Sequence, residues 1–187
     1  ENLIADIDEE MYRKIVENRS VKDKDAKDTA KIVGLSAIKY GDLSNQATKD
    51  YIFDVDRFTS FEGNTGPYIL YTIVRIKSIL NRYVQEGGAL STGKILPAVN
   101  ASEKNLMLQL SGFAAMVENA FEEKAPHKIC AYIYEVSNAF NSFYHETKIL
   151  SEEDQAQKES FLQLLQLTRR VLETSIDLLG FSAPDRM

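Results

Sequence analysis

The chain has 187 residues, of which 44% are hydrophobic and 27% charged, as in an ordinary globular protein. Its net charge of −6 argues against holding DNA or RNA by bulk electrostatics, and no apolar run approaches the roughly 20 residues of a membrane-spanning helix. The single cysteine, Cys130, excludes an internal disulfide and a cysteine-rich zinc site, and no secretion signal is visible. We therefore expect a cytoplasmic protein without a membrane or DNA partner. Because an initiator methionine is missing, we expect a piece of a longer protein.

The N-terminal part of the chain predicts two helices and then an irregular segment. Three apolar residues at a spacing of four predict a short amphipathic helix over residues 6–18, with Asp6 as its cap. These residues are Ile7, Met11 and Ile15. A second helix is expected from residue 22 to about residue 39, because the pattern breaks at Gly41. The alternation over residues 51–56 then predicts a short extended piece.

A polar loop with two glycines, residues 61–66, leads into a long helix. Thr65 stands where an N-cap hydroxyl belongs, and Pro67 suits a first helical turn. Gly87 and Gly88 are expected to end the helix. Its second row of side chains predicts a buried face. That row is Ile69, Thr72, Ile73, Ile76, Ile79, Leu80 and Tyr83.

Tyr68, Tyr71 and Arg75 lie at spacings of three and four along this helix, so their side chains share one face. Tyrosine offers a flat ring for stacking and a hydroxyl for hydrogen bonding. Arginine offers a planar cation that stacks on bases and binds phosphate. Spacing alone nevertheless favours half-buried core tyrosines and a solvated arginine, since aromatic stripes on helices usually belong to the core.

Three further amphipathic helices complete an all-α helical bundle, preceded by the shorter N-terminal connector. The first begins at Ser102, with a predicted core row of Leu106, Leu110, Phe113, Ala114, Val117 and Phe121. The second begins at Pro126, with a core row of Ile129, Ile133, Val136, Phe140 and Phe143. Tyr144 lies at the edge of that row. The third follows a capping segment that starts at Ser151, and it ends at Gly180.

The sequence contains no visible active site. The only histidines, His127 and His145, lack a serine, cysteine or carboxylate partner at a triad spacing. No phosphate-binding loop is present, and the acids around Asp54 have neither a nearby histidine nor the spacing of a metal-binding loop. We therefore expect no catalytic residue, no metal and no cofactor in this chain.

Several runs carry more than helical periodicity. They are GLSAIKYGDLS at 34–44, DYIFD at 50–54, FEGNTGPY at 61–68, ICAYIYE at 129–135, FNSFY at 140–144, LLG at 178–180 and DRM at 185–187. Together these runs closely resemble the second half of the arginyl-tRNA synthetase family, over nearly the whole chain. The resemblance is weaker over residues 90–119, where only the helical pattern agrees.

The resemblance implies a C-terminal fragment with two parts. Residues 1–60 would be the end of the class I catalytic domain and its connector, and residues 61–187 would be the anticodon-binding domain of the DALR type. The whole enzyme would activate arginine with ATP and magnesium and transfer it to arginine tRNA. The two ATP-binding signatures of the family are absent from this chain, so they would lie in the upstream catalytic domain. The fragment alone is expected to be inactive.

The resemblance also assigns contacts with the tRNA anticodon. Tyr68, Tyr71 and Arg75 would face the anticodon loop, Tyr144 would stack on one base, and Met187 would pack against another. The physics agrees, because splayed bases need stacking platforms that are worth about 1–3 kcal/mol per base.

The chain departs from the family pattern at three positions. Val55 stands where tryptophan is usual, Leu70 where glutamine is frequent, and Thr72 where alanine is common. A glutamine lost at Leu70 would remove a hydrogen bond near the anticodon.

Two alternatives stay open. The bundle could be a protein-interaction or structural domain with its tyrosines in the core. It could also belong to another class I synthetase, such as one for cysteine, although the FEGNTGPY and DRM runs argue against that. Exposure discriminates between RNA binding and a purely structural role, because RNA-contacting residues must converge on one accessible surface.

Overall fold

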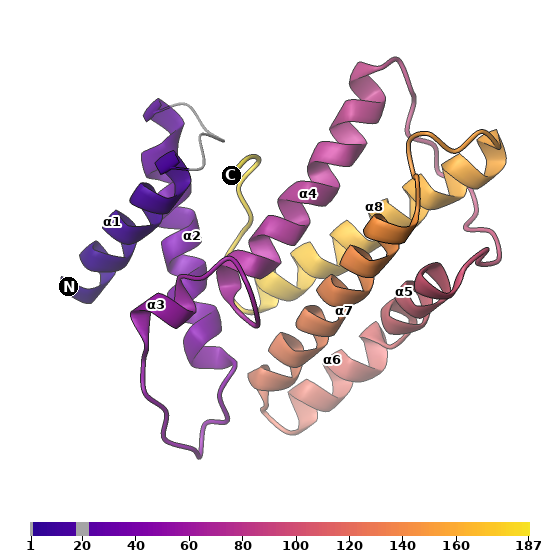
Figure 1. Ribbon diagram of the computed structural model, residues 1–187. Helices are drawn as coiled ribbons and strands as arrows, with labels where there is room; N and C mark the ends of the chain where they lie inside the picture. Colours follow the sequence, from indigo (N-terminus) through magenta and orange to yellow (C-terminus); the bar gives the residue numbers. More distant parts are fainter. Residues whose placement is uncertain (1, 18–22) are drawn as a thin grey trace.

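The computed structural model describes residues 2–17 and 23–187, and this part of the chain forms eight α-helices and no strand (Figure 1). The helices are α1 (Asn2–Glu17), α2 (Asp23–Leu43), α3 (Val55–Phe58), α4 (Gly66–Gln85), α5 (Ala101–Ser111), α6 (Phe113–Glu122), α7 (Pro126–Glu146) and α8 (Gln155–Leu178). The predicted all-α bundle is thereby confirmed. The predicted end of the first helix at residue 18 and the start of the second at residue 22 lie outside the described residues.

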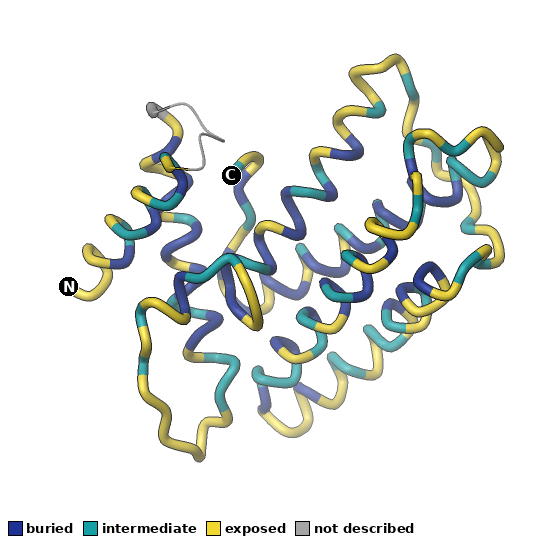
Figure 2. Tube along the Cα trace, viewed as in Figure 1, coloured by how far each residue is buried: buried dark blue, intermediate teal, exposed yellow. Residues whose placement is uncertain are grey.

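The long helices α4, α7 and α8 pack against one another in the bundle, and α5 and α6 cover the outer side of α7 (Figure 1). Helix α2 packs against α4, and α1 packs against α2 (Figure 1). Buried residues recur along α1, α2, α4, α5, α7 and α8 (Figure 2), whereas α6 buries only Ala120, and together they form one cluster that reaches from Ile7 to Phe181. The division into residues 1–60 and 61–187 stays a prediction, and this apolar core continues across it.

Two predictions for the first helices are wrong at their ends. Helix α1 begins at Asn2, so Asp6 lies inside the helix and does not cap it. Helix α2 continues through Gly41 to Leu43. Gly41 serves close packing, since a Cβ there would lie only 3.0 Å from the ring of Phe58. The three predicted core residues of α1 are buried, namely Ile7, Met11 and Ile15.

The segment before α4 is irregular, and the extended piece predicted over residues 51–56 is wrong at Val55 and Asp56, which belong to α3. The residue before them is Asp54. This residue has an extended backbone and caps the single turn of α3, because its Oδ1 accepts a hydrogen bond from the Arg57 amide at 3.1 Å. Asp54 therefore has a capping role. Within the described residues, no group of three or more histidine, cysteine, aspartate or glutamate side chains could hold a metal ion.

The single helix predicted from Ser102 is in fact two helices, α5 and α6, which meet at Gly112. The Gly112 amide bonds to the carbonyl of Gln109, so the helix tightens and the following turn is rotated. The predicted core row is therefore correct at Leu106 and Leu110 and fails beyond the break. Phe121 is 84% exposed, and Ala120 is buried in its place. Ala114 is exposed as well, and Phe113 and Val117 are only half-buried.

The last two helices largely match the predictions. Helix α7 begins at Pro126 and buries its whole predicted row. The N-cap of α8 is Asp154 rather than Ser151, and its Oδ1 accepts from the Gln157 amide at 2.9 Å. Gly180 has φ +81°, and the Phe181 amide bonds to the Ile176 carbonyl, which ends α8 as predicted.

Cys130 lies on the inner face of α7, where it behaves as a small apolar residue. It is fully buried and unpaired, and burial raises the pKa of its thiol to about 12. Among the helices of the described residues, none combines the length and the apolarity that a bilayer crossing requires.

Candidate nucleic-acid interface

The start of α4 is fixed by the polar loop that precedes it. The Thr65 hydroxyl accepts a hydrogen bond from the Tyr68 amide at 3.2 Å and donates one to the Ser60 carbonyl at 2.6 Å. Thr65 is thus the N-cap, and Pro67 lies in the first turn, as the sequence predicts. Gly66 sits directly against the backbone of Ser36 on α2, which sets the position of α4 relative to α2.

Arg75 on α4 is held between two tyrosine rings. Its guanidinium carbon lies 4.7 Å from the ring centre of Tyr71 and 5.1 Å from that of Tyr144, which comes from α7. Nη1 donates to Oδ1 of Asn141 at 2.7 Å, and Nη2 donates to the Tyr71 hydroxyl at 3.1 Å. Tyr71 is 40% exposed and Tyr144 is 38% exposed, so both rings keep free surface.

Tyr68 is half-buried and belongs to the same hydrogen-bond network as Arg75 and Asn141. Its hydroxyl accepts a hydrogen bond from Nδ2 of Asn141 and donates one to Oδ1 of Asn138, both at 2.8 Å. Burial raises the pKa of this hydroxyl, so it stays protonated and able to donate. Asn141 thereby links Arg75 to Tyr68, and α4 to α7.

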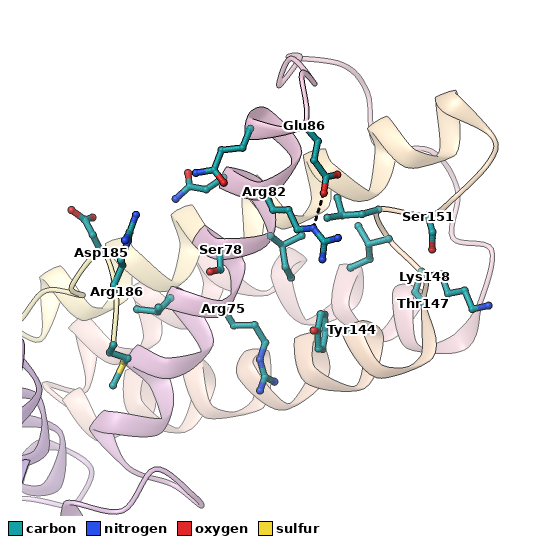
Figure 3. Close-up of a pocket in the computed structure, with 17 residues that line it drawn as sticks. Arg75, Ser78, Arg82, Glu86, Tyr144, Thr147, Lys148, Ser151, Asp185 and Arg186 are labelled. Atoms are coloured by element: carbon teal, nitrogen blue, oxygen red, sulfur yellow. Dashed lines mark hydrogen bonds and ion pairs between the residues drawn. The ribbon is translucent and has the colours of Figure 1, made fainter. Parts of the chain in front are cut away.

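A groove of about 900 Å³ opens beside Arg75 and Tyr144 (Figure 3). Helix α4, the segment between α7 and α8, and the C-terminal residues form its walls. Four cationic side chains line it, namely Arg75, Arg82, Lys148 and Arg186, together with two acidic ones, Glu86 and Asp185. These six side chains therefore sum to a formal charge of +2, although the side chains of the whole chain sum to −6. Positive charge is thus concentrated in this groove, which favours an anionic ligand there.

The five predicted contact residues differ in how they relate to the groove. Arg75, Tyr144 and Met187 line the groove. Tyr71 adjoins it through its stacking on Arg75, and Tyr68 contributes through Asn141. The structure thus brings the five residues to one side of the bundle, and their contact with tRNA stays a prediction.

Two of the departures from the family pattern face the core. The Leu70 side chain is completely buried, so a change at this position does not alter the lining of the groove. Thr72 is also buried, and its hydroxyl bonds to the Tyr68 carbonyl at 3.1 Å. The loss of a hydrogen bond near the anticodon at Leu70 stays a prediction.

Sequence reasoning missed Asn138 and Asn141. The sequence could have indicated a special role for them, because asparagine is a poor helix former and both residues lie inside a helix. Asn141 also precedes Tyr144 by three positions and so shares its face. Their partners on α4 were not visible from spacing.

Replacing Asn141 with leucine should lower the free energy of unfolding by about 1 kcal/mol, the net contribution of a typical hydrogen bond, because the groups it pairs are partly buried. The change removes one partner each from Arg75 and Tyr68. Urea unfolding measures the effect, with Asn105→Leu on the exposed side of α5 as the matched control. Equal losses in the two variants would show that the link is energetically unimportant.

The comparison with protein families bears on the whole bundle. The family model of the DALR anticodon binding domain matches residues 69–187. The chain belongs to the DALR anticodon-binding domain family. The whole chain is 64% identical to part of an arginine–tRNA ligase from Agathobacter rectalis and 51% identical to part of one from Alkaliphilus oremlandii. It spans about a third of the length of these curated relatives.

Solved structures agree with the sequence relatives. The whole chain superposes on 32% of the Thermus thermophilus arginyl-tRNA synthetase, with a TM-score of 0.89 at 28% identity. It also superposes on 33% of the Plasmodium falciparum arginyl-tRNA synthetase, with a TM-score of 0.83 at 26% identity. The fold of the helical part of these synthetases is therefore preserved in this chain.

Proposed function

We propose that this anticodon-binding domain recognises arginine tRNA as part of an enzyme that ligates arginine to that tRNA. The observation that carries the proposal is the convergence of Arg75, Tyr144 and Met187 on one groove with a positive lining. The likeness to arginine–tRNA ligases over the whole chain supports the choice of tRNA.

The groove offers each kind of contact that unpaired nucleotides need. The free surface of the Tyr144 ring is a platform on which a splayed base stacks. Met187 offers an apolar contact to a neighbouring base. Arg82, Lys148 and Arg186 are exposed cations that would pair with phosphates along the strand.

Arg75 has a double role in this proposal. Its guanidinium orients the rings of Tyr71 and Tyr144, and Asn141 and the Tyr71 hydroxyl fix its own plane. The stacking platforms are therefore held in place before RNA arrives, which reduces the entropy cost of binding.

The remaining two thirds of such an enzyme would bind arginine, ATP and magnesium. We expect no aminoacylation by this chain alone, because the two ATP-binding signatures of the family are absent from its sequence. An enzyme that charges tRNA for protein synthesis would work in the cytoplasm.

Fluorescence anisotropy tests the proposal. Labelled arginine tRNA and a non-cognate tRNA are titrated with the chain, and with the full-length enzyme, at two salt concentrations. We expect preferential binding of arginine tRNA, weaker at the higher salt because phosphate contacts release counterions. Equal binding of both tRNAs, or no binding by either protein, would overturn the proposal and favour a protein-interaction domain.

A further inference from the structure

The C-terminal residues return from the end of α8 towards α4. After Gly180, residues 181–187 form no helix and run beside α4 (Figure 1). Phe181 and Pro184 are buried, whereas Asp185 and Arg186 are exposed. This tail ends with Met187, which lines the same groove as Arg75. The position of the tail thus sets one wall of the groove.

Lys77 on α4 contacts this tail near its end, at Pro184 and Asp185. Its Nζ donates to the Pro184 carbonyl at 3.3 Å and lies 3.6 Å from Oδ1 of Asp185. The same Nζ lies 3.3 Å from Oε1 of Glu173 on α8, whose Oε2 accepts from Arg169 at 3.1 Å. One ammonium group therefore joins α4, α8 and the tail.

The environment of Lys77 differs from that of ordinary surface ion pairs. Its side chain is only 14% exposed, and both of its acidic partners are distant in the sequence. The pair Arg82–Glu86, by contrast, joins neighbouring turns of one helix and is largely exposed. The pair with Glu173, whose side chain is 33% exposed, is therefore less screened by salt and water than a surface pair. The Asp185 side chain is fully exposed, so its pairing with Lys77 is screened, and the Pro184 carbonyl is the firmer contact with the tail.

A second lysine fixes the base of the tail. Nζ of Lys39 on α2 donates to the Gly180 carbonyl at 2.6 Å. The tail is thus anchored at its start by Lys39 and near its end by Lys77. Only the Lys77 anchor lies next to Asp185 and the two residues that follow it into the groove.

We propose that Lys77 is a positioning residue that holds the C-terminal tail against α4, so that Arg186 and Met187 form a preformed wall of the RNA groove. The consequence of this positioning role for RNA binding rests on the proposed function. Without Lys77, the last residues would have to be ordered at the moment of binding, and that entropy cost would weaken the complex. Lys77 acts through Met187 rather than by touching a base.

The first test measures the tail without RNA. The chain has four methionines, Met11, Met107, Met116 and Met187, so labelling with methyl-¹³C methionine gives four methyl signals. In Lys77→Leu, the Met187 signal should sharpen and move to the position of an unstructured methionine, while the other three stay in place. Lys77→Arg should restore the native signal. Lys104→Leu, an exposed site on α5 with the same charge change, should leave all four signals unchanged.

The second test measures coupling in RNA binding. Met187→Ala should weaken binding of arginine tRNA about fivefold, the low end for a base contact, in the otherwise unchanged chain. The same substitution should cost less than about twofold when Lys77→Leu is already present, because the tail then no longer forms the wall. Equal losses in both backgrounds would overturn the proposal.

The two tests separate the possible failures. If the unchanged chain and the full-length enzyme bind no arginine tRNA, the proposed function fails, and the methyl signals alone decide whether Lys77 orders the tail. A native Met187 signal in Lys77→Leu overturns the positioning role, whatever the RNA result.

Discussion

Replacing Tyr144 with alanine is expected to weaken binding of arginine tRNA by about 1–3 kcal/mol, which is about 5- to 150-fold. The ring is 38% exposed at the groove and is backed on α7 by Phe140, whose ring centre lies 6.1 Å away. Truncation removes the stacking platform, and it also frees the guanidinium of Arg75 from one of its two flanking rings. Anisotropy titration with labelled arginine tRNA measures the loss.

The matched control is Tyr144→Phe, which keeps the ring and removes only the hydroxyl. We expect it to bind within about twofold of the unchanged chain, because stacking depends on the ring face. Thermal unfolding of both variants checks that the bundle stays folded at the titration temperature. Binding that is unaffected by the alanine change would exclude Tyr144 as a base platform, and an equal loss in the phenylalanine variant would assign the effect to the hydroxyl.

Substituting Gly66 with alanine should lower the free energy of unfolding by about 1–3 kcal/mol or more, the range found for overpacked sites. A Cβ at this position would lie 2.6 Å from the Ser36 carbonyl carbon and closer still to its oxygen. Both atoms belong to the backbone of α2, so no side-chain rotation relieves the clash. The two helices have to move apart.

Steric overlap and helix propensity predict opposite changes in stability for Gly66→Ala, so the measurement separates them. Gly66 lies in α4 and has no positive φ, so helix propensity alone would make alanine stabilising by up to about 1 kcal/mol. Urea unfolding distinguishes the two results. Gly93→Ala is the control, because the nearest atom is the side-chain hydroxyl oxygen of Ser91 at 3.3 Å and no backbone atom lies closer. A Gly66→Ala variant as stable as the control would show that α2 and α4 adjust without cost.

The FEGNTGPY run illustrates how far local sequence determines structure. Gly63 adopts φ +78°, Thr65 caps α4, and Pro67 occupies its first turn. Each of these roles follows from backbone chemistry within a few residues, and the cap and the proline were therefore predictable. The role of Gly66 was not, because it depends on Ser36, which is thirty positions away in the sequence.

The wrong predictions also arise where the local sequence does not reveal the role of a glycine. Gly41 reads as a helix breaker, yet it lies within α2 because Phe58 packs against it. Gly112 reads as one position of a continuous helix, yet the chain turns there and Phe121 becomes 84% exposed. A glycine permits a turn, a close contact or an ordinary helix, and the sequence alone does not distinguish among these.

The sequence by itself determined the helical class, both ends of α4, the start of α7, and the resemblance that names the contact residues. It also determined the buried row of α7 and, apart from the half-buried Tyr83, that of α4. These properties follow from periodicity and capping, which act over one or two turns. Only the tertiary structure decided that Arg75 lies against Tyr144 and Asn141, and that Lys77 holds the tail beside them. Periodicity shows which residues share a face of one helix, but the packing of the whole core decides which faces meet.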